Sequence, residues 1–161
     1  MTVHNFKTSL AKGQVGEAAF LKLWPTPLER LDGRKHDFKL IGTNSTLELK
    51  TDSYDATKTE NFFMELYSDI DRGKVGGPWQ ALKNGTTYWC YFFPTNGLVY
   101  EFETAKLAEW LDFNWKDYDV CNIRNRTWIT VGIKVPRKTL EHLYKVHAFS
   151  LENIQHKASN T

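Results

Sequence analysis

The segment Tyr88–Phe93, with the sequence YWCYFF, constrains the fold of this chain more than any other. All of its residues are aromatic or cysteine, so a strand built from them is apolar on both faces. Such a strand is stable only when other structure covers both sides of its sheet. We therefore expect Tyr88–Phe93 to be a central strand of a mixed α/β architecture in which helices flank the sheet.

Length and composition fit a single domain over residues 1–161. A chain of 161 residues supports one hydrophobic core better than two. Hydrophobic residues make up 41% of the chain, which excludes global disorder. The formal net charge is only +2, so overall charge does not by itself indicate a nucleic-acid-binding protein. Any such function has to depend on a local site.

Hydrophobic periodicity and turn residues predict the remaining elements. A helix is expected over residues 10–24, ended by Pro25, with a buried stripe made of Val15, Ala18, Ala19 and Leu23. Residues 37–41 and 46–51 are expected to form a hairpin across the turn at 42–45. The other expected elements are strands over 61–68, 98–102 and 127–135, helices over 79–83 and 104–112, and a last helix over 136–144.

The two cysteines and the lack of long apolar runs bear on the compartment. Cys90 and Cys121 are too few for a disulfide scaffold, so both are expected to be reduced and structural. The chain has no run of about 18 apolar residues, and its first residues lack the apolar segment of a signal peptide. These features predict a cytoplasmic (intracellular) protein that does not enter a membrane.

Asp37 and the segment Glu48-Leu49-Lys50 form the most informative chemical pattern. Glu48 and Lys50 share one face of the expected strand, because successive side chains of a strand point to opposite faces. The hairpin would bring Asp37 beside them. Two carboxylates and a backbone carbonyl make a hard oxygen site suited to Mg²⁺, and a nearby ammonium group can stabilise charge on a phosphate. The pattern therefore predicts the groups needed for phosphodiester hydrolysis.

These residues, as His36-Asp37-Phe38 followed by Glu48-Leu49-Lys50, resemble the PD-(D/E)XK nuclease superfamily. The resemblance implies a restriction-endonuclease-like fold, a mixed central β-sheet of about five strands flanked by helices. It implies a metal-dependent DNA endonuclease that uses an activated water and Mg²⁺, with Mn²⁺ as a substitute. Asp37, Glu48 and the Leu49 carbonyl would be the metal ligands, and Lys50 the electrostatic helper. Glu17, in the first helix, would support the metal or its water.

Further segments match small phage-type members of that superfamily. They are a strand at 61–65, a glycine-bearing loop at 74–78 and the segment Thr87-Tyr88-Trp89, so the resemblance covers residues 10–100. Two features depart from the pattern: His36 stands where proline is usual, and Asn84 follows Gln80 where RecB-like exonucleases have tyrosine. Holliday junction resolvases of archaeal type share the same core and are the closest alternative.

The remaining expectations concern partners. Six basic residues flank the expected site in sequence order and are candidate contacts to the DNA backbone: Lys7, Lys12, Lys58, Arg72, Lys74 and Lys83. Cuts on both strands of a duplex would favour a homodimer. A different class of function, a non-catalytic DNA-binding or protein-interaction module on the same scaffold, also remains open.

Overall fold

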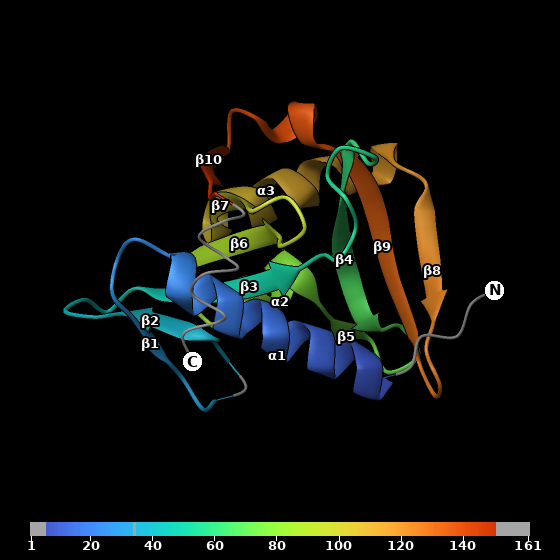
Figure 1. The fold of residues 1–161 in the computed structure, drawn as a ribbon. Coiled ribbons are helices and arrows are strands. Elements are labelled where there is room, and N and C mark those ends of the chain that lie inside the picture. Colours follow the sequence, from blue (N-terminus) through green and yellow to red (C-terminus); the bar gives the residue numbers. More distant parts are fainter. Residues whose placement is uncertain (1–5, 34, 151–161) are drawn as a thin grey trace.

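A six-stranded mixed sheet forms the main layer of the fold (Figure 1). The computed structural model describes residues 6–33 and 35–150, with side chains from residue 15 onward. The strands of this sheet, in spatial order, are β1 (Leu28–Arg30), β2 (Phe38–Leu40), β3 (Thr46–Thr51), β6 (Tyr88–Phe93), β7 (Leu98–Glu103) and β10 (Tyr144–Ala148). Strands β3 and β6 are parallel, and the other neighbouring pairs are antiparallel. Tyr88–Phe93 is therefore an inner strand, as its sequence predicts.

A second, four-stranded antiparallel sheet stands beside the first. Its spatial order is β5 (Lys74–Val75), β4 (Asn61–Asp69), β9 (Ile129–Pro136) and β8 (Val120–Arg124). The mixed α/β class is confirmed, but the expected single sheet of about five strands is wrong in its extent. Strand β4 leaves the main sheet and pairs with β9, with Phe62 opposite Val135 and Met64 opposite Ile133. These buried pairs explain the second sheet, because β4 finds more apolar surface on β9 than an edge position would give it.

Helices cover the sheets. Helix α1 (Phe6–Leu23) lies across one face of the main sheet, while α2 (Gly77–Lys83) and α3 (Thr104–Asn114) lie on the other side (Figure 1). Two 3-10 turns, Trp115–Asp117 and Arg137–Leu140, complete the elements. The last helix expected over 136–144 is wrong: a 3-10 turn is followed by β10, which pairs with the otherwise open edge of β7. Within the described residues, no helix has the length and apolar character needed to cross a bilayer.

The main sheet separates two hydrophobic cores. The larger lies between the two sheets and includes Phe62, Tyr91 and Leu107, and the smaller lies under α1 and includes Phe20 and Phe92. The stripe expected on α1 is wrong in part, because Val15 is 70% exposed and Ala18 is exposed, whereas Phe20 is fully buried. Phe20 occupies the buried position because its aromatic side chain removes far more apolar surface from water than valine or alanine does.

Gly16 allows α1 to approach β3 closely. A Cβ atom placed on Gly16 would lie 2.6 Å from Thr51 Cγ2 and 2.9 Å from Thr51 Cβ, closer than carbon atoms pack. The absence of a side chain therefore sets the distance between the helix and the strand. Because Glu17 is the next residue of the helix, the same contact fixes the backbone position from which the Glu17 side chain extends.

We expect Gly16→Ala to lower the free energy of unfolding by up to about 2 kcal/mol. The overpacking against Thr51 costs about 1–3 kcal/mol, which a gain of about 1 kcal/mol in helix propensity only partly offsets. Urea unfolding of the two proteins measures the difference.

Gly33→Ala is the matched control, because the nearest atom to an added Cβ there is 4.0 Å away. Its effect should stay within about 0.5 kcal/mol. In a Thr51→Ala background the cost of Gly16→Ala should shrink, since the two atoms beyond Thr51 Cβ are gone. An equal cost in both backgrounds would contradict the proposed contact.

Candidate active site

The β2–β3 hairpin fixes Asp37 beside β3. Phe38 lies opposite Leu47 in the antiparallel register, and the Asp37 amide donates to the Leu47 carbonyl at 3.1 Å. The Leu49 amide in turn donates to Asp37 Oδ2 at 2.8 Å. The carboxylate is therefore held by the backbone of the strand that carries Glu48 and Lys50, as the spacing of these residues predicts.

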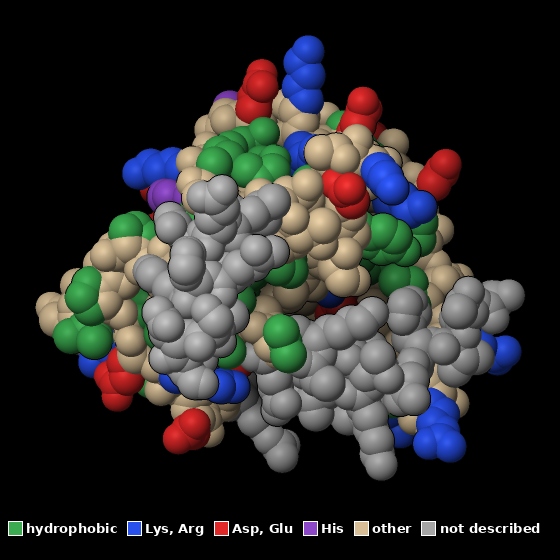
Figure 2. Space-filling view, viewed as in Figure 1, with side chains coloured by type: hydrophobic (Ala, Val, Ile, Leu, Met, Phe, Trp, Pro, Cys, Tyr) green, Lys and Arg blue, Asp and Glu red, His purple; other side chains and the backbone are tan. Residues whose placement is uncertain are grey.

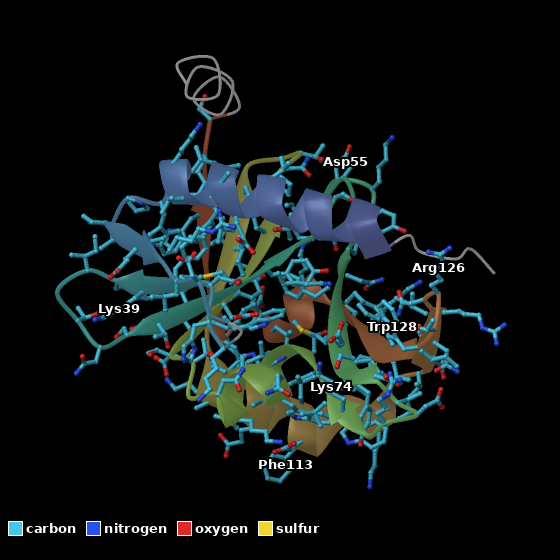
Figure 3. The ribbon with its side chains drawn as sticks, turned by 90° about the horizontal axis from the view of Figure 1, so that it is seen from below. Lys39, Asp55, Lys74, Phe113, Arg126 and Trp128 are labelled. Atoms are coloured by element: carbon cyan, nitrogen blue, oxygen red, sulfur yellow. The ribbon has the colours of Figure 1, made fainter. Side chains whose placement is uncertain are left out.

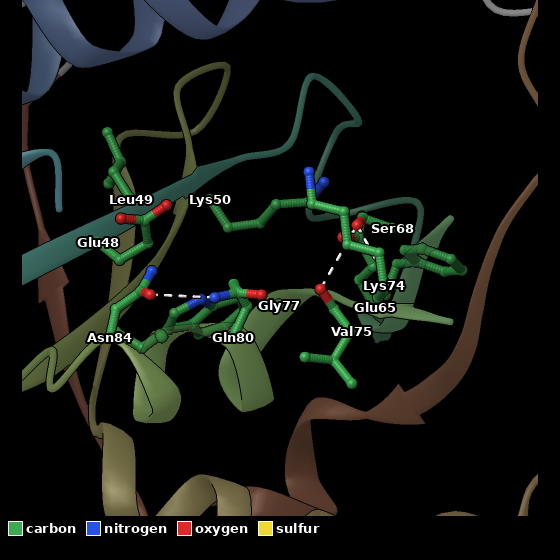
Figure 4. A pocket seen from close by; sticks show the side chains of 14 residues that line it. Glu48, Leu49, Lys50, Glu65, Ser68, Lys74, Val75, Gly77, Gln80 and Asn84 are labelled. Atoms are coloured by element: carbon green, nitrogen blue, oxygen red, sulfur yellow. Dashed lines mark hydrogen bonds between the residues drawn. The ribbon is translucent and has the colours of Figure 1, made fainter. Parts of the chain in front are cut away.

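Strand β3 divides its side chains between the two faces of the main sheet. Leu47 and Leu49 pack into the core under α1, whereas Glu48 and Lys50 line a pocket of about 260 Å³ between the two sheets (Figure 4). This division is the expected alternation of a strand. It gives the pocket one acidic and one basic side chain from the same strand.

Glu17 reaches the same region from α1. Its Oε2 accepts a hydrogen bond from Arg30 Nη2 at 2.8 Å, and its side chain is 22% exposed. The Glu17 charge raises the pKa of both Asp37 and Glu48. The three carboxylates named from the sequence therefore lie close enough to repel one another.

Burial and mutual repulsion shift the pKa values of the two hairpin acids. Burial is the main cause that raises the pKa of Asp37 to about 6, with the hydrogen bond from Leu49 opposing the rise. Burial, followed by the charges of Asp37 and Glu17, raises the pKa of Glu48 to about 8. Arg30 lowers the pKa of Asp37 only partly. The raised pKa values mean that the ionised forms of Asp37 and Glu48 are disfavoured here, and a bound cation would favour those forms.

The carboxylate oxygens of Glu17, Asp37 and Glu48 are chemically suited to a hard divalent cation, but the three groups do not surround one common point. Within the described part of the chain, no three His, Cys, Asp or Glu side chains are arranged to hold one ion. Glu17 is instead paired with Arg30. Asp37 and Glu48, both oxygen donors with raised pKa values, are the residues that would hold Mg²⁺, with the Leu49 carbonyl as a backbone donor.

The second sheet and α2 supply the opposite wall of the pocket. Glu65 packs against Gly76 and Gly77, where an added Cβ on Gly76 would lie 2.8 Å from the Glu65 Cδ. Gln80 Nε2 donates to Asn84 Oδ1 at 3.0 Å, and both side chains face the pocket (Figure 4). The Lys50 and Lys74 side chains extend toward the same part of the pocket in this view. A phosphate entering here would meet cations from both sheets.

The structure brings together some of the expected DNA contacts and separates others. Lys74 lines the pocket, and Arg72, in the turn before it, pairs with Asp69 at 2.6 Å. Lys58 precedes the first residue of β4 while Lys74 follows the last, so roughly 25–30 Å of strand lies between them. Lys83 is exposed on the last turn of α2. The side chains of Lys7 and Lys12 lie outside the described residues.

Several pocket residues escape prediction from the sequence. Arg30 belongs to a three-residue strand, too short to show any periodicity. Ser68, Gln80 and Asn84 enter the pocket only because β4 of the second sheet and helix α2 face β3. His36 hydrogen-bonds Thr86 through Nδ1 at 2.8 Å, which accounts for it as a structural residue. Cys90 and Cys121 are both free, as expected.

No protein-family model matches this sequence, and no curated protein matches it significantly. The chemistry of the site therefore has to be argued from its own geometry. That geometry comprises three carboxylates whose charges repel one another and a pocket lined by Glu48 and by Lys50 of the same strand.

In the absence of divalent metal, we expect Glu48→Gln to stabilise the protein increasingly as pH rises from about 5 to about 8. The folded-state pKa of Glu48 is raised to about 8 from an ordinary value of 4.5, so the folded state binds more protons than the unfolded chain in this range. The contribution of Glu48 to the free energy of unfolding is thus greatest below pH 4.5 and falls between there and about pH 8, by up to about 1.4 kcal/mol per pH unit, because the unfolded chain has released the proton that the folded state keeps. The variant removes that loss.

Denaturant unfolding in EDTA at pH 5, 6, 7 and 8 measures the difference. Glu29→Gln, at an exposed position of β1, is the control and should give a difference that does not change with pH. A Glu48→Gln protein less stable than wild type at pH 8 would rule out the raised pKa.

Proposed function

We propose that this protein is a metal-dependent DNA endonuclease with a restriction-endonuclease-like core formed by α1, the β2–β3 hairpin and β6. The single observation that carries the proposal is the grouping of Glu17, Asp37 and Glu48, whose charges repel one another, next to an open pocket lined by Glu48 and Lys50. Such an arrangement is costly for folding unless a cation binds it. That the protein keeps these carboxylates together despite the cost to its stability favours a functional role for them.

Each residue has a role in phosphodiester hydrolysis. Asp37 and Glu48 would hold Mg²⁺, with Mn²⁺ as a substitute, and the Leu49 carbonyl would complete the protein's donor set. The bound ion supplies Lewis-acid chemistry, polarising a phosphate and lowering the pKa of a coordinated water. Lys50 contributes positive charge opposite the phosphate oxygens as the negative charge on them grows. Glu17, released from Arg30, would accept a hydrogen bond from the attacking water.

The pocket is open and carries Lys50 and Lys74, while its two amide side chains, Gln80 and Asn84, are hydrogen-bonded to each other. This arrangement favours contacts to phosphates and therefore a non-specific or structure-selective substrate. A four-way junction, as for a Holliday junction resolvase, belongs to the same proposal, and so does a homodimer that cuts both strands. A DNA substrate is compatible with the cytoplasmic location expected from the sequence, which stays part of the proposal.

A second candidate rests on the Arg30–Glu17 ion pair. An arginine already supplied by the chain partly neutralises the acidic group, as it would in a non-catalytic DNA-binding module on the same scaffold. The two candidates differ in whether Mg²⁺ displaces Arg30 from the acidic group.

We expect the wild-type protein to nick plasmid DNA or cut four-way junctions in Mg²⁺ or Mn²⁺ and to be inactive in EDTA. Lys50→Ala and Glu48→Gln should each lower the cleavage rate by at least about 100-fold, since each removes charge or a ligand used at the transition state. Gel assays on duplex, junction, flap and single-stranded substrates measure the rates.

Lys39→Ala is the matched control, because Lys39 is a half-buried lysine of the same hairpin that does not line the pocket; it should cleave like wild type. A readout independent of activity is the melting temperature at pH 8, which Mg²⁺ should raise in wild type but not in Glu48→Gln. Full activity of Lys50→Ala would refute the mechanism. DNA binding with neither cleavage nor a Mg²⁺ shift would support the non-catalytic module.

A further inference from the structure

The tip of the β8–β9 hairpin carries two arginines that the proposed reaction does not use. Arg124 and Arg126 are both exposed, and their side chains make no ion pair or hydrogen bond with another described residue. The Asn125 amide donates to the Trp128 carbonyl at 2.9 Å, which closes the turn between the strands. The two guanidinium groups are therefore presented on an ordered turn.

Hydrogen bonds connect this turn to the pocket. Asn125 Nδ2 donates to Thr130 Oγ1 at 2.9 Å, and Thr130 Oγ1 donates to the carbonyl of Ser68, a pocket residue, at 3.1 Å. The Ile70 amide also donates to the Ile129 carbonyl at 3.0 Å. The hairpin tip thus has a fixed position relative to the pocket wall.

The β4–β5 turn adds positive charge at the same end of the second sheet. The two turn segments, residues 69–74 and 124–128, contain the cations Arg72, Lys74, Arg124 and Arg126 and the acids Asp69 and Asp71. Asp69 is buried and paired with Arg72, so the outward-facing charge is positive. Figure 2 shows basic side chains on the side where Figure 1 places the hairpin tip. Trp128 and Arg126 lie on the side of the molecule opposite Lys39, and Lys74 lies between them near the middle of the view (Figure 3).

We propose that Arg124 and Arg126 bind the phosphate backbone of the DNA whose scissile bond occupies the pocket, and so extend the nucleic-acid interface along the end of the second sheet. The identity of the polymer rests on the proposed function. Arginine binds phosphate oxygens in bidentate fashion. Lys74 lines the pocket and continues the positive charge toward the turn. A flexible or bent polyanion can contact both places, whereas a flat anionic membrane would meet only the tip.

The test is binding of a fluorescein-labelled 30-base-pair duplex in EDTA, measured by anisotropy over a range of NaCl concentrations. The double variant Arg124→Ala/Arg126→Ala should bind about tenfold more weakly at ~0.1 M salt, equally for unrelated sequences, and the slope of log K against log salt should be smaller by about 2. Arg124→Lys/Arg126→Lys should keep most of the slope, since the charge remains. In the cleavage assay the double alanine variant should show a raised KM with an unchanged kcat.

Lys138→Ala/Lys145→Ala removes two exposed lysines from the Arg137–Leu140 turn and β10 and should leave affinity and slope as in wild type. Equal effects of the two double alanine variants, or no effect of either, would overturn the inference. Arginine-dependent binding to phosphatidylserine vesicles without DNA binding would also overturn it. Arginine-dependent DNA binding by a protein that cleaves no substrate would support the inference while refuting the nuclease proposal.

Discussion

The hydroxyl group of Tyr91 joins the three parts of the molecule between which the pocket forms. It accepts a hydrogen bond from the Phe63 amide of β4 at 3.1 Å and donates to Asp52, just after β3, at 2.5 Å. Burial and the Asp52 charge raise the pKa of Tyr91 far above its usual value, so the phenol keeps the proton that it donates. Arg137, stacked near Phe93 and Tyr100, holds the β3–β4 connection by donating to the Ala56 and Thr59 carbonyls. These contacts fix the position of the second sheet relative to the first, and the pocket between the sheets depends on that fixed position.

Local signals in the sequence predict the strands of this fold better than they predict which strands pair. The apolar run of β6 and the turn in the β2–β3 hairpin are local signals, and both elements are where they were expected. The alternation of β4, by contrast, is compatible with either sheet, and only its buried pairs with β9 decide between them. Strands β1 and β5 have three and two residues, too few for a period to appear. β10 is a strand because an open edge of β7 was available, a non-local cause that no window of sequence contains.

The site shows the same division. Asp37, Glu48 and Lys50 could be grouped from the sequence because one hairpin carries them all, and Glu17 was added through a resemblance. Arg30 could not be predicted as a site residue from the sequence, because its role depends on β1 lying beside α1. The pocket walls from β4 and α2 depend on the second sheet and were equally hidden. What the acidic group does chemically is a proposal that rests on its electrostatics rather than on kinship with a known enzyme.

The two separate cores have a thermodynamic consequence for the acidic group. The described apolar side chains of helix α1 pack into the smaller core, whereas the walls facing Glu48 belong to the larger one. Undocking of the helix therefore costs only part of the global unfolding free energy, and subglobal openings of this kind are common in folded domains. A ligand held jointly by Glu17 and Glu48 would span that division and clamp the helix in place. Occupancy of the acidic group by the ligand and protection of the α1 amides from hydrogen exchange would then rise together, because both report the docking equilibrium of α1.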